Sequence, residues 1–232
     1  MRYQEFERIV SEERMRRYVE ACEGDTRKAM TLYRYNIELS QTMFAIICQF
    51  EVALRNAVNT KLTARLGNDW LRDSVLDNGV FTHPILTKTR EVIRYAYGKL
   101  QRDNAYTHTK LLAEMEFGIW KYMFSPVQYR QTGRVLLSIF PNRPRSSAQM
   151  QYNHSYFFNE LDKINTLRNR IAHHEPICFP AQSASIYTTY ILTEHQKILT
   201  LLEWMDINVS EFLYGLDHVK RMYNRIEKLK SV

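Results

Sequence analysis

Residues 167–176 read Leu-Arg-Asn-Arg-Ile-Ala-His-His-Glu-Pro, and they close an apolar-periodic segment that begins near Tyr152. The spacing of the apolar side chains predicts a helix over about residues 150–175, which the proline ends. At about 100° per residue, Arg168 falls in the middle of the apolar stripe. An unpaired buried guanidinium is costly, so we expect Arg168 to be paired, to line a cleft or to lie at an interface. The stripe consists of Phe157, Leu161, Ile164 and Ile171.

The composition favours helices over sheets. The 232 residues include only 7 glycines and 6 prolines, and helix formers such as leucine, arginine and glutamate are frequent. The sequence has no glycine-rich phosphate loop of the Walker or the Rossmann type. We therefore predict an all-α fold. Because neither a repeat nor a long linker divides the chain, we expect one domain over residues 1–232, with residues 1–24 as an N-terminal accessory helix.

Charge, cysteines and apolar runs narrow the classes of function. The formal net charge of +7 suggests an anionic partner, with nucleic acid as the leading candidate. Cys22, Cys48 and Cys178 are odd in number and widely separated, which indicates reduced thiols and neither a disulfide framework nor a zinc site. The N-terminus lacks an apolar signal-peptide core, and the longest apolar run, residues 43–48, is too short to cross a bilayer. We expect a cytoplasmic protein without a membrane partner and without a cofactor.

Hydrophobic periodicity, interrupted by glycine and proline, predicts the other helices. We expect one amphipathic helix from Tyr3 to about Cys22. The helical segment from Thr26 to about Leu66 exceeds the usual globular length and leaves room for a kink or a break. Further helices are expected over about residues 84–100, 109–116, 118–124, 129–139, 183–205 and 209–230, the last interrupted at Gly215.

Arg168, Asn169 and His173 carry the groups that internal transesterification of RNA requires. A histidine titrates in the right range to move the proton of the 2′-OH or of the leaving group. The permanently charged arginine fork stabilises negative charge on a pentacoordinate phosphate. The asparagine amide orients the phosphate or the histidine. This chemistry needs no metal ion, in keeping with a sequence that lacks the carboxylate cluster of metal-dependent nucleases.

The spacing of these three residues favours a homodimer. Asn169 and His173 are four residues apart and share a helical face. Arg168 and His173 are five residues apart, so their side chains diverge by about 140° on an ideal helix. One helix therefore cannot aim both side chains at one atom. A cleft between two copies of the helix, related by a two-fold axis, would collect them from both chains.

The run from Arg168 to His173 resembles the R-x4-6-H signature of HEPN ribonucleases. The longer run from residue 167 to residue 177 resembles more specifically the Abi-like (AbiD/AbiF) proteins of bacterial abortive infection. Two upstream blocks are similar to the same family, namely Phe-Glu-Val-Ala-Leu-Arg-Asn at 50–56 and Phe-Gly-Ile-Trp at 117–120. The resemblance spans about residues 36–202.

The resemblance implies an all-helical HEPN-type bundle with additional helices that dimerises to form a composite, metal-independent active site for RNA. Arg168 would bind and stabilise the scissile phosphate, Asn169 would orient it, and His173 would act as acid and base. The products would be a 2′,3′-cyclic phosphate and a 5′-hydroxyl. The resemblance further implies a toxin-like role in antiphage defence and a small non-coding RNA inhibitor as a partner.

Several of these residues also have structural interpretations. Arg168 would equally form a buried ion pair with Glu51, and Glu51 would then orient it. Glu51 and Arg55, four residues apart, either pair within a helix or support the Arg168 pocket. A histidine at position 173 or 174 would cap the helix C-terminus, and we expect His174 only to support the site.

Three arginines are candidates for RNA binding. Arg143 and Arg145 lie on the loop before the motif helix. Together with Arg170 they would steer RNA phosphates towards the site. The alternative is that they are ordinary solvated charges. The aromatic block at 117–124 is more typical of a core or a dimer contact than of a base-stacking platform. No HExxH spacing is present around His173, so we expect no metal site.

The sequence thus predicts a metal-independent HEPN endoribonuclease that cleaves RNA in antiphage defence. The alternative from another class is a non-catalytic RNA-binding or dimeric scaffold protein that keeps the same fold.

Overall fold

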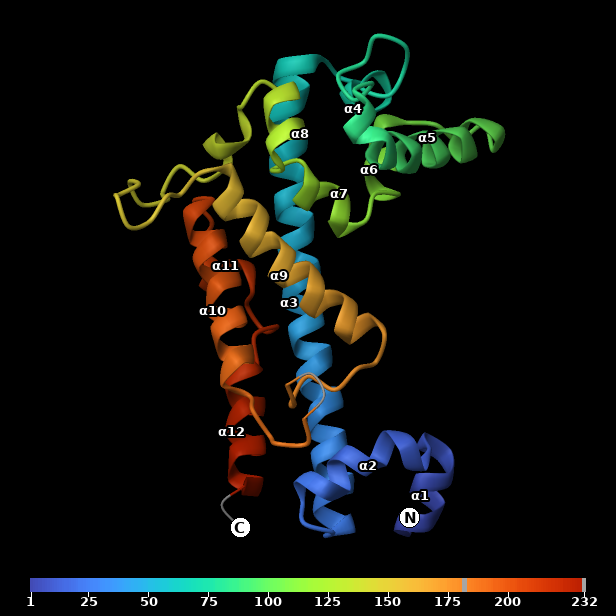
Figure 1. The fold of residues 1–232 in the computed structure, drawn as a ribbon, viewed down its shortest axis with the longest axis vertical. Coiled ribbons are helices and arrows are strands. Elements are labelled where there is room, and N and C mark those ends of the chain that lie inside the picture. Colours follow the sequence, from blue (N-terminus) through green and yellow to red (C-terminus); the bar gives the residue numbers. More distant parts are fainter. Residues whose placement is uncertain (181–182, 231–232) are drawn as a thin grey trace. The chain divides into compact units, whose positions relative to one another are not determined.

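The computed structural model describes residues 1–180 and 183–230 and consists of helices joined by loops (Figure 1). Over this part of the chain it contains no β-strand, which confirms the all-α class. The more specific HEPN-type arrangement stays a prediction. The helices are α1 (Tyr3–Val10), α2 (Glu12–Ala21), α3 (Thr26–Leu66), α4 (Trp70–Asp73), α5 (Thr87–Arg102), α6 (His108–Ala113), α7 (Phe117–Tyr122), α8 (Pro126–Gln131), α9 (His154–Ala172), α10 (Thr189–Trp204), α11 (Val209–Phe212) and α12 (Val219–Lys230), with 3₁₀ turns η1 (Pro84–Leu86) and η2 (Leu136–Ile139).

The helices belong to two compact units. Unit 1 comprises Met1–Gln49, Thr166–Thr200 and Asn208–Val232, and unit 2 comprises Phe50–Asn165 and Leu201–Ile207. The boundary passes through α3, α9 and α10, so each of these helices contributes to both units. The single domain expected over residues 1–232 stays a prediction.

The N-terminal segment of unit 1 forms two helices where the periodicity predicted one. Ser11 has φ 82° and ψ 146°, a positive-φ conformation that an α-helix cannot contain, and it separates α1 from α2. The Ser11 side chain accepts a hydrogen bond from the Arg14 backbone N–H and caps α2. In the same way, Asp25 Oδ1 accepts from the backbone N–H groups of Arg27 and Lys28 at the start of α3.

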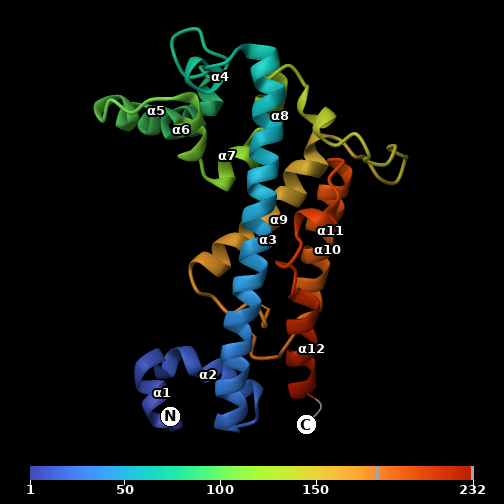
Figure 2. The ribbon, with the colours of Figure 1, turned by 180° about the vertical axis from the view of Figure 1, so that it is seen from behind.

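Helix α3 is one continuous helix of 41 residues. The break that its unusual length allowed in the sequence analysis does not occur. By length and composition alone it is long and apolar enough to cross a membrane. The core helix of a soluble protein meets the same two criteria. Helix α3 can be followed along its length in both views of the ribbon (Figure 1 and Figure 2).

Among the C-terminal helices, α10 begins later than the periodicity predicts, whereas α11 begins at Val209 and the expected interruption at Gly215 is confirmed. Helix α10 starts at Thr189, and the segment expected to be helical over 209–230 is divided into α11 and α12 around Gly215, which has φ 74°. Helix α12 is held to α3 by Arg225. Its guanidinium lies 2.5 Å from the Glu38 carboxylate and 4.1 Å from the centre of the Tyr35 ring.

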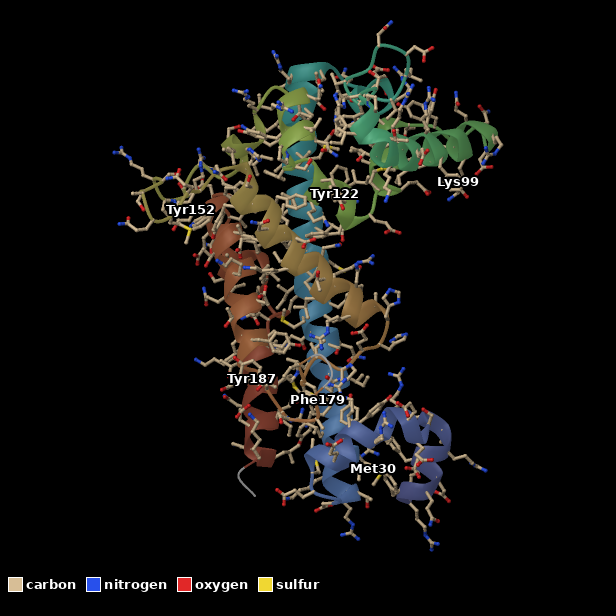
Figure 3. All side chains as sticks on the ribbon, in the orientation of Figure 1. Met30, Lys99, Tyr122, Tyr152, Phe179 and Tyr187 are labelled. Carbon is tan, nitrogen blue, oxygen red and sulfur yellow. The ribbon has the colours of Figure 1, made fainter. Side chains whose placement is uncertain are left out.

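An aromatic core fills unit 2. The rings of Phe140 and Phe157 stack with their centroids 4.1 Å apart. In the block at 117–124, three rings are fully buried, which agrees with the core interpretation, whereas Tyr122 is 44% exposed (Figure 3). Lys121 lies beside it, with Nζ 4.4 Å from the centre of the Tyr122 ring. The fully buried aromatic side chains of unit 2 include Trp70, Phe81, Phe117, Trp120, Phe124, Phe140 and Phe157.

A polar cluster around Asn59 joins α3, α4 and α6 inside unit 2. Asn59 Oδ1 accepts hydrogen bonds from Trp70 Nε1 (2.8 Å) and Thr63 Oγ1 (3.3 Å), and it lies 2.8 Å from His108 Nε2. Because a carbonyl oxygen only accepts, His108 must carry its proton on Nε2. His108 Nδ1 is buried and has no hydrogen-bond partner within the described part of the chain. Burial lowers the pKa of His108.

We predict that acid weakens the fold through His108. The pKa of the unfolded side chain is about 6.5, whereas the folded pKa is lower, so the unfolded state takes up the proton first as the pH falls. The contribution of His108 to stability is present above about pH 6.5 and is lost below it. In His108→Gln, which keeps a side-chain N–H donor, the melting temperature should fall less between pH 7 and pH 5 when followed by circular dichroism.

The exposed His218 provides the control for this experiment. His218→Gln should keep the pH dependence of the unmodified chain. An unchanged pH dependence in His108→Gln would contradict the role given to the buried imidazole.

Candidate active site

The motif lies at the C-terminal end of α9, within unit 1. The helix spans His154–Ala172, where the sequence predicts about residues 150–175. The apolar stripe of α9 is buried along its length, from Phe157 at 0% to Ile171 at 9% exposure. Arg168 is only half-buried, because Leu167, at 3% exposure, occupies the buried side of this turn. The guanidinium of Arg168 is therefore within reach of solvent and of a ligand.

Of the three predicted catalytic residues, Arg168 and Asn169 lie on the last turns of α9, and His173 directly follows the helix. Arg168 Nη1 donates a long hydrogen bond of 3.4 Å to Asn169 Oδ1, so these two side chains lie side by side. The backbone N–H of His173 donates to the carbonyl of Asn169 at 2.9 Å, which continues the helical pattern. The His173 side chain is exposed and has no recorded hydrogen bond or ion pair within the described residues. Its imidazole is therefore available to a substrate.

Helix α9 ends in a Schellman motif. The N–H of Glu175 donates to the carbonyl of Arg170 at 2.8 Å, and the N–H of His174 donates to that of Ile171 at 3.0 Å. His174 occupies the left-handed position of the motif, with φ 58°, where glycine is the common residue. Pro176 follows directly and prevents further helix. This reversal fixes the direction in which the chain leaves His173.

We predict that His174→Gly is about 1 kcal/mol more stable than His174→Ala, because a Cβ is disfavoured at this φ. Both variants remove the imidazole, so the difference between their free energies of unfolding reports the cost of the backbone conformation at position 174. Urea unfolding of the two proteins measures this difference. Equal stability would show that His174 is not left-handed in solution.

Arg170 is occupied by contacts within the protein. Its Nη1 donates to Tyr190 Oη at 2.8 Å, and its Nη2 donates to the carbonyls of Pro176 (2.7 Å) and Phe179 (3.0 Å). Its Nε also lies 3.5 Å from the Glu175 carboxylate. Tyr190 Oη in turn donates to a backbone carbonyl of the same loop, and burial raises its pKa to about 12. These contacts favour a structural role for Arg170, and the RNA-binding role stays a prediction.

Two arginines of α2 hold the same segment, a function that sequence reasoning did not assign to them. Arg14 Nη1 donates to the carbonyl of His174 at 2.8 Å. Arg17 donates to the carbonyls of Pro180 (2.8 Å) and Ser183. The only sequence signal is the spacing of Arg14 and Arg17, which are three residues apart and share a face of α2. Helix α2, expected as an accessory, thus positions the chain that follows the motif.

Asn36 of α3 is the fourth anchor of this segment. Its Oδ1 accepts from the backbone N–H groups of Ile177 (2.8 Å) and Cys178 (3.0 Å), although the residue is only 2% exposed. Next to these, the fully buried ring of Phe179 packs edge-on against Tyr18 at 5.1 Å (Figure 3). Burial raises the pKa of the Cys178 thiol, which keeps it protonated at neutral pH.

An apolar hollow with a volume of about 520 Å³ opens beside the motif, between α3 and the end of α9. Both sides of the hollow belong to unit 1. Its walls include Ile37 and Phe44 from α3 and Ile171 and Ala172 from α9. Asn36 also lines it, so the anchor of the loop is at the same time part of the hollow.

The remaining candidates lie in unit 2. Glu51 and Arg55 are half-exposed and one turn apart on α3, and the pairings expected for them, including that of Glu51 with Arg168, stay predictions. Arg143 Nη1 donates to the carbonyls of Leu137 (2.8 Å) and Phe140 (3.0 Å), which holds the turn after η2. Arg145 is exposed. Of these two loop arginines, Arg145 is therefore the better candidate for binding an external anion.

Residues suited to metal binding are scattered. Among the residues described, no three His, Cys, Asp or Glu side chains gather where they would hold a metal ion. The three cysteines carry thiols, with Cys178 buried and Cys22 half-buried.

The comparison with known families gives one match. The family model described as Abi-like protein covers residues 1–178, which is most of the chain. The matched region includes the whole motif and also α1 and α2, whereas α10, α11 and α12 lie beyond it. The resemblance indicated by the sequence motifs spans about residues 36–202, so the two ranges differ at both ends. No curated protein and no solved structure matches the chain.

Proposed function

The chain belongs to the Abi-like protein family, and on this premise we propose that it is a metal-independent endoribonuclease of the HEPN type that acts in abortive infection. One observation carries the proposal. Arg168 and Asn169 lie side by side, and the imidazole of His173 is exposed on the next turn of the same helix end. These are the three groups that cleavage of RNA by its own 2′-OH requires.

The chemistry assigns one task to each side chain. His173 accepts the 2′-OH proton while the 2′-oxygen attacks phosphorus. The bond from phosphorus to the 5′-oxygen then breaks, and this oxygen leaves as a 5′-hydroxyl after protonation by a histidine. Arg168 stabilises the negative charge that develops on the phosphate oxygens. Asn169, in contact with the guanidinium, orients it or the phosphate. The other product is a 2′,3′-cyclic phosphate.

The site is proposed to be composite. Arg168 and His173 point in different directions from one helix, so a two-fold pair of motif helices would supply the two groups from different chains. The exposed end of α9 supports this, because His173 and His174 are accessible on unit 1. We propose that the homodimer works in the cytoplasm as a toxin-like effector, that its partner is RNA, and that a small non-coding RNA restrains it.

We predict that the protein cleaves single-stranded RNA in the presence of EDTA, and that His173→Ala lowers the rate about 10²–10⁴-fold, as expected for loss of a general acid or base. Denaturing gels of end-labelled RNA would measure both, and a 2′,3′-cyclic phosphate terminus would identify the chemistry. RNA binding without cleavage would favour the non-catalytic RNA-binding or scaffold alternative. Cleavage abolished by EDTA would contradict the metal-free mechanism.

Arg168 and Arg170 form a matched pair for separating catalysis from folding. Arg168→Met should lower the cleavage rate about 10²–10³-fold, the scale of a lost electrostatic stabiliser, and leave the melting temperature nearly unchanged. Arg170→Met breaks hydrogen bonds to two backbone carbonyls and should destabilise the fold by roughly 3 kcal/mol. Thermal unfolding and cleavage rates of both variants test this. If Arg168→Met instead lowers the melting temperature and leaves the cleavage rate unchanged, Arg168 takes no part in the reaction.

A further inference from the structure

The apolar hollow beside the motif has the size and the lining of a small-molecule site. Its volume of about 520 Å³ falls within the range of roughly 300–1,000 Å³ typical of ligand pockets. Ile37 and Phe44, seven residues apart, present their side chains from one face of α3. Ile171 and Ala172 close the opposite side from α9. A flat, mostly apolar ligand would be in contact with both walls.

One polar group of the hollow, the side-chain amide of Asn36, is fixed in orientation by its hydrogen bonds. Asn36 Oδ1 accepts from two backbone N–H groups, and only an oxygen can accept, so the amide must present Nδ2 on its other side. No hydrogen bond from Asn36 Nδ2 is recorded within the described part of the chain, although the residue is 2% exposed and lines the hollow. Nδ2 is not among the fully buried side-chain atoms without a partner, so solvent in the hollow reaches it, and a ligand that brings an acceptor would take the place of that water.

The hollow adjoins the residues proposed to cut RNA. Ala172 and His174, which precede and follow His173 in the chain, both line it. Glu175 and Gln41 add polar groups to its lining. A ligand in the hollow would therefore contact the residues on either side of His173 in the chain.

We propose that this hollow receives one unpaired nucleobase of the RNA substrate, adjacent to the scissile phosphate. The inference rests on the proposed ribonuclease function and specifies how that site holds its substrate. The base lies between the side chains of α3 and α9, and a ring carbonyl or ring nitrogen accepts from Asn36 Nδ2. Insertion of an unstacked base beside aromatic and apolar side chains is the usual mode by which proteins recognise single-stranded RNA. An abasic nucleotide would lack this contact.

Two substitutions separate the hollow from the catalytic residues. Asn36→Asp keeps an oxygen for the N–H groups of Ile177 and Cys178 but replaces the Nδ2 donor by an acceptor. Ser40→Phe fills the hollow from α3 without altering α9. Thr31→Phe, on the same helix but outside the hollow, is the control for an added ring. Thermal unfolding verifies that each variant is folded. If Asn36→Asp does not fold, Ser40→Phe alone tests the proposal.

The experiment measures RNA affinity by fluorescence anisotropy in a His173→Ala background, which prevents cleavage. The probes are a short single-stranded RNA of mixed sequence and an oligomer of the same length built from abasic riboses. Ser40→Phe and Asn36→Asp should weaken binding of the normal RNA roughly tenfold, the scale of one lost base contact, and leave binding of the abasic oligomer unchanged. Thr31→Phe should change neither.

The outcomes distinguish this inference from the function on which it rests. If the unmodified protein cleaves RNA but both hollow variants bind normal RNA as tightly as the parent, the base site is refuted and the ribonuclease stands. If Ser40→Phe instead dissociates a dimer in sedimentation experiments without changing RNA affinity, the hollow receives a second copy of the chain, and the proposal fails. If the unmodified protein neither binds nor cleaves RNA, both proposals fail together.

Discussion

The chain that follows the motif depends on side chains that supply hydrogen bonds to its backbone. Ile177, Cys178 and Phe179 are completely buried yet lie outside any helix, so their N–H and carbonyl groups need partners from elsewhere. Asn36 accepts from two of the N–H groups, and Arg170 donates to two carbonyls of the same loop. Without these contacts, backbone N–H and carbonyl groups of the loop would be buried without partners, at a cost in free energy.

This constraint divides the basic residues of the motif region into two classes. Arg14, Arg17 and Arg170 direct their guanidinium groups at backbone carbonyls and serve the fold. Among the described residues, the Arg168 guanidinium hydrogen-bonds its neighbour Asn169 and no backbone carbonyl, and Arg168 remains half-exposed. The distinction supports the proposed chemistry, because an arginine that stabilises a phosphate must be free of competing carbonyl acceptors. The same anchoring uses the amide oxygen of Asn36, a residue that also lines the hollow, so one buried side chain links loop stability to the proposed recognition of a base.

Local sequence patterns were sufficient to predict many elements and less reliable where the backbone leaves the regular helix. The all-α class and the helix that carries the motif follow from periodicity and from the few glycines, because these depend on neighbours along the chain. The division of the first helix at Ser11 and the left-handed His174 were not foreseen. Both positions have side chains other than glycine, so composition gives little warning of their positive φ.

The sequence by itself determined the helical class, the family motif and the identity of the groups proposed for catalysis. Only the tertiary structure decided which of the adjacent arginines is available to a ligand, because that depends on the carbonyls that a distant segment presents. It also decided that Asn36, more than a hundred residues before the motif, holds the loop after it and lines the hollow beside it. Contacts of such long sequence separation leave no periodic signal, since they are set by how helices pack and not by the spacing of residues within one helix.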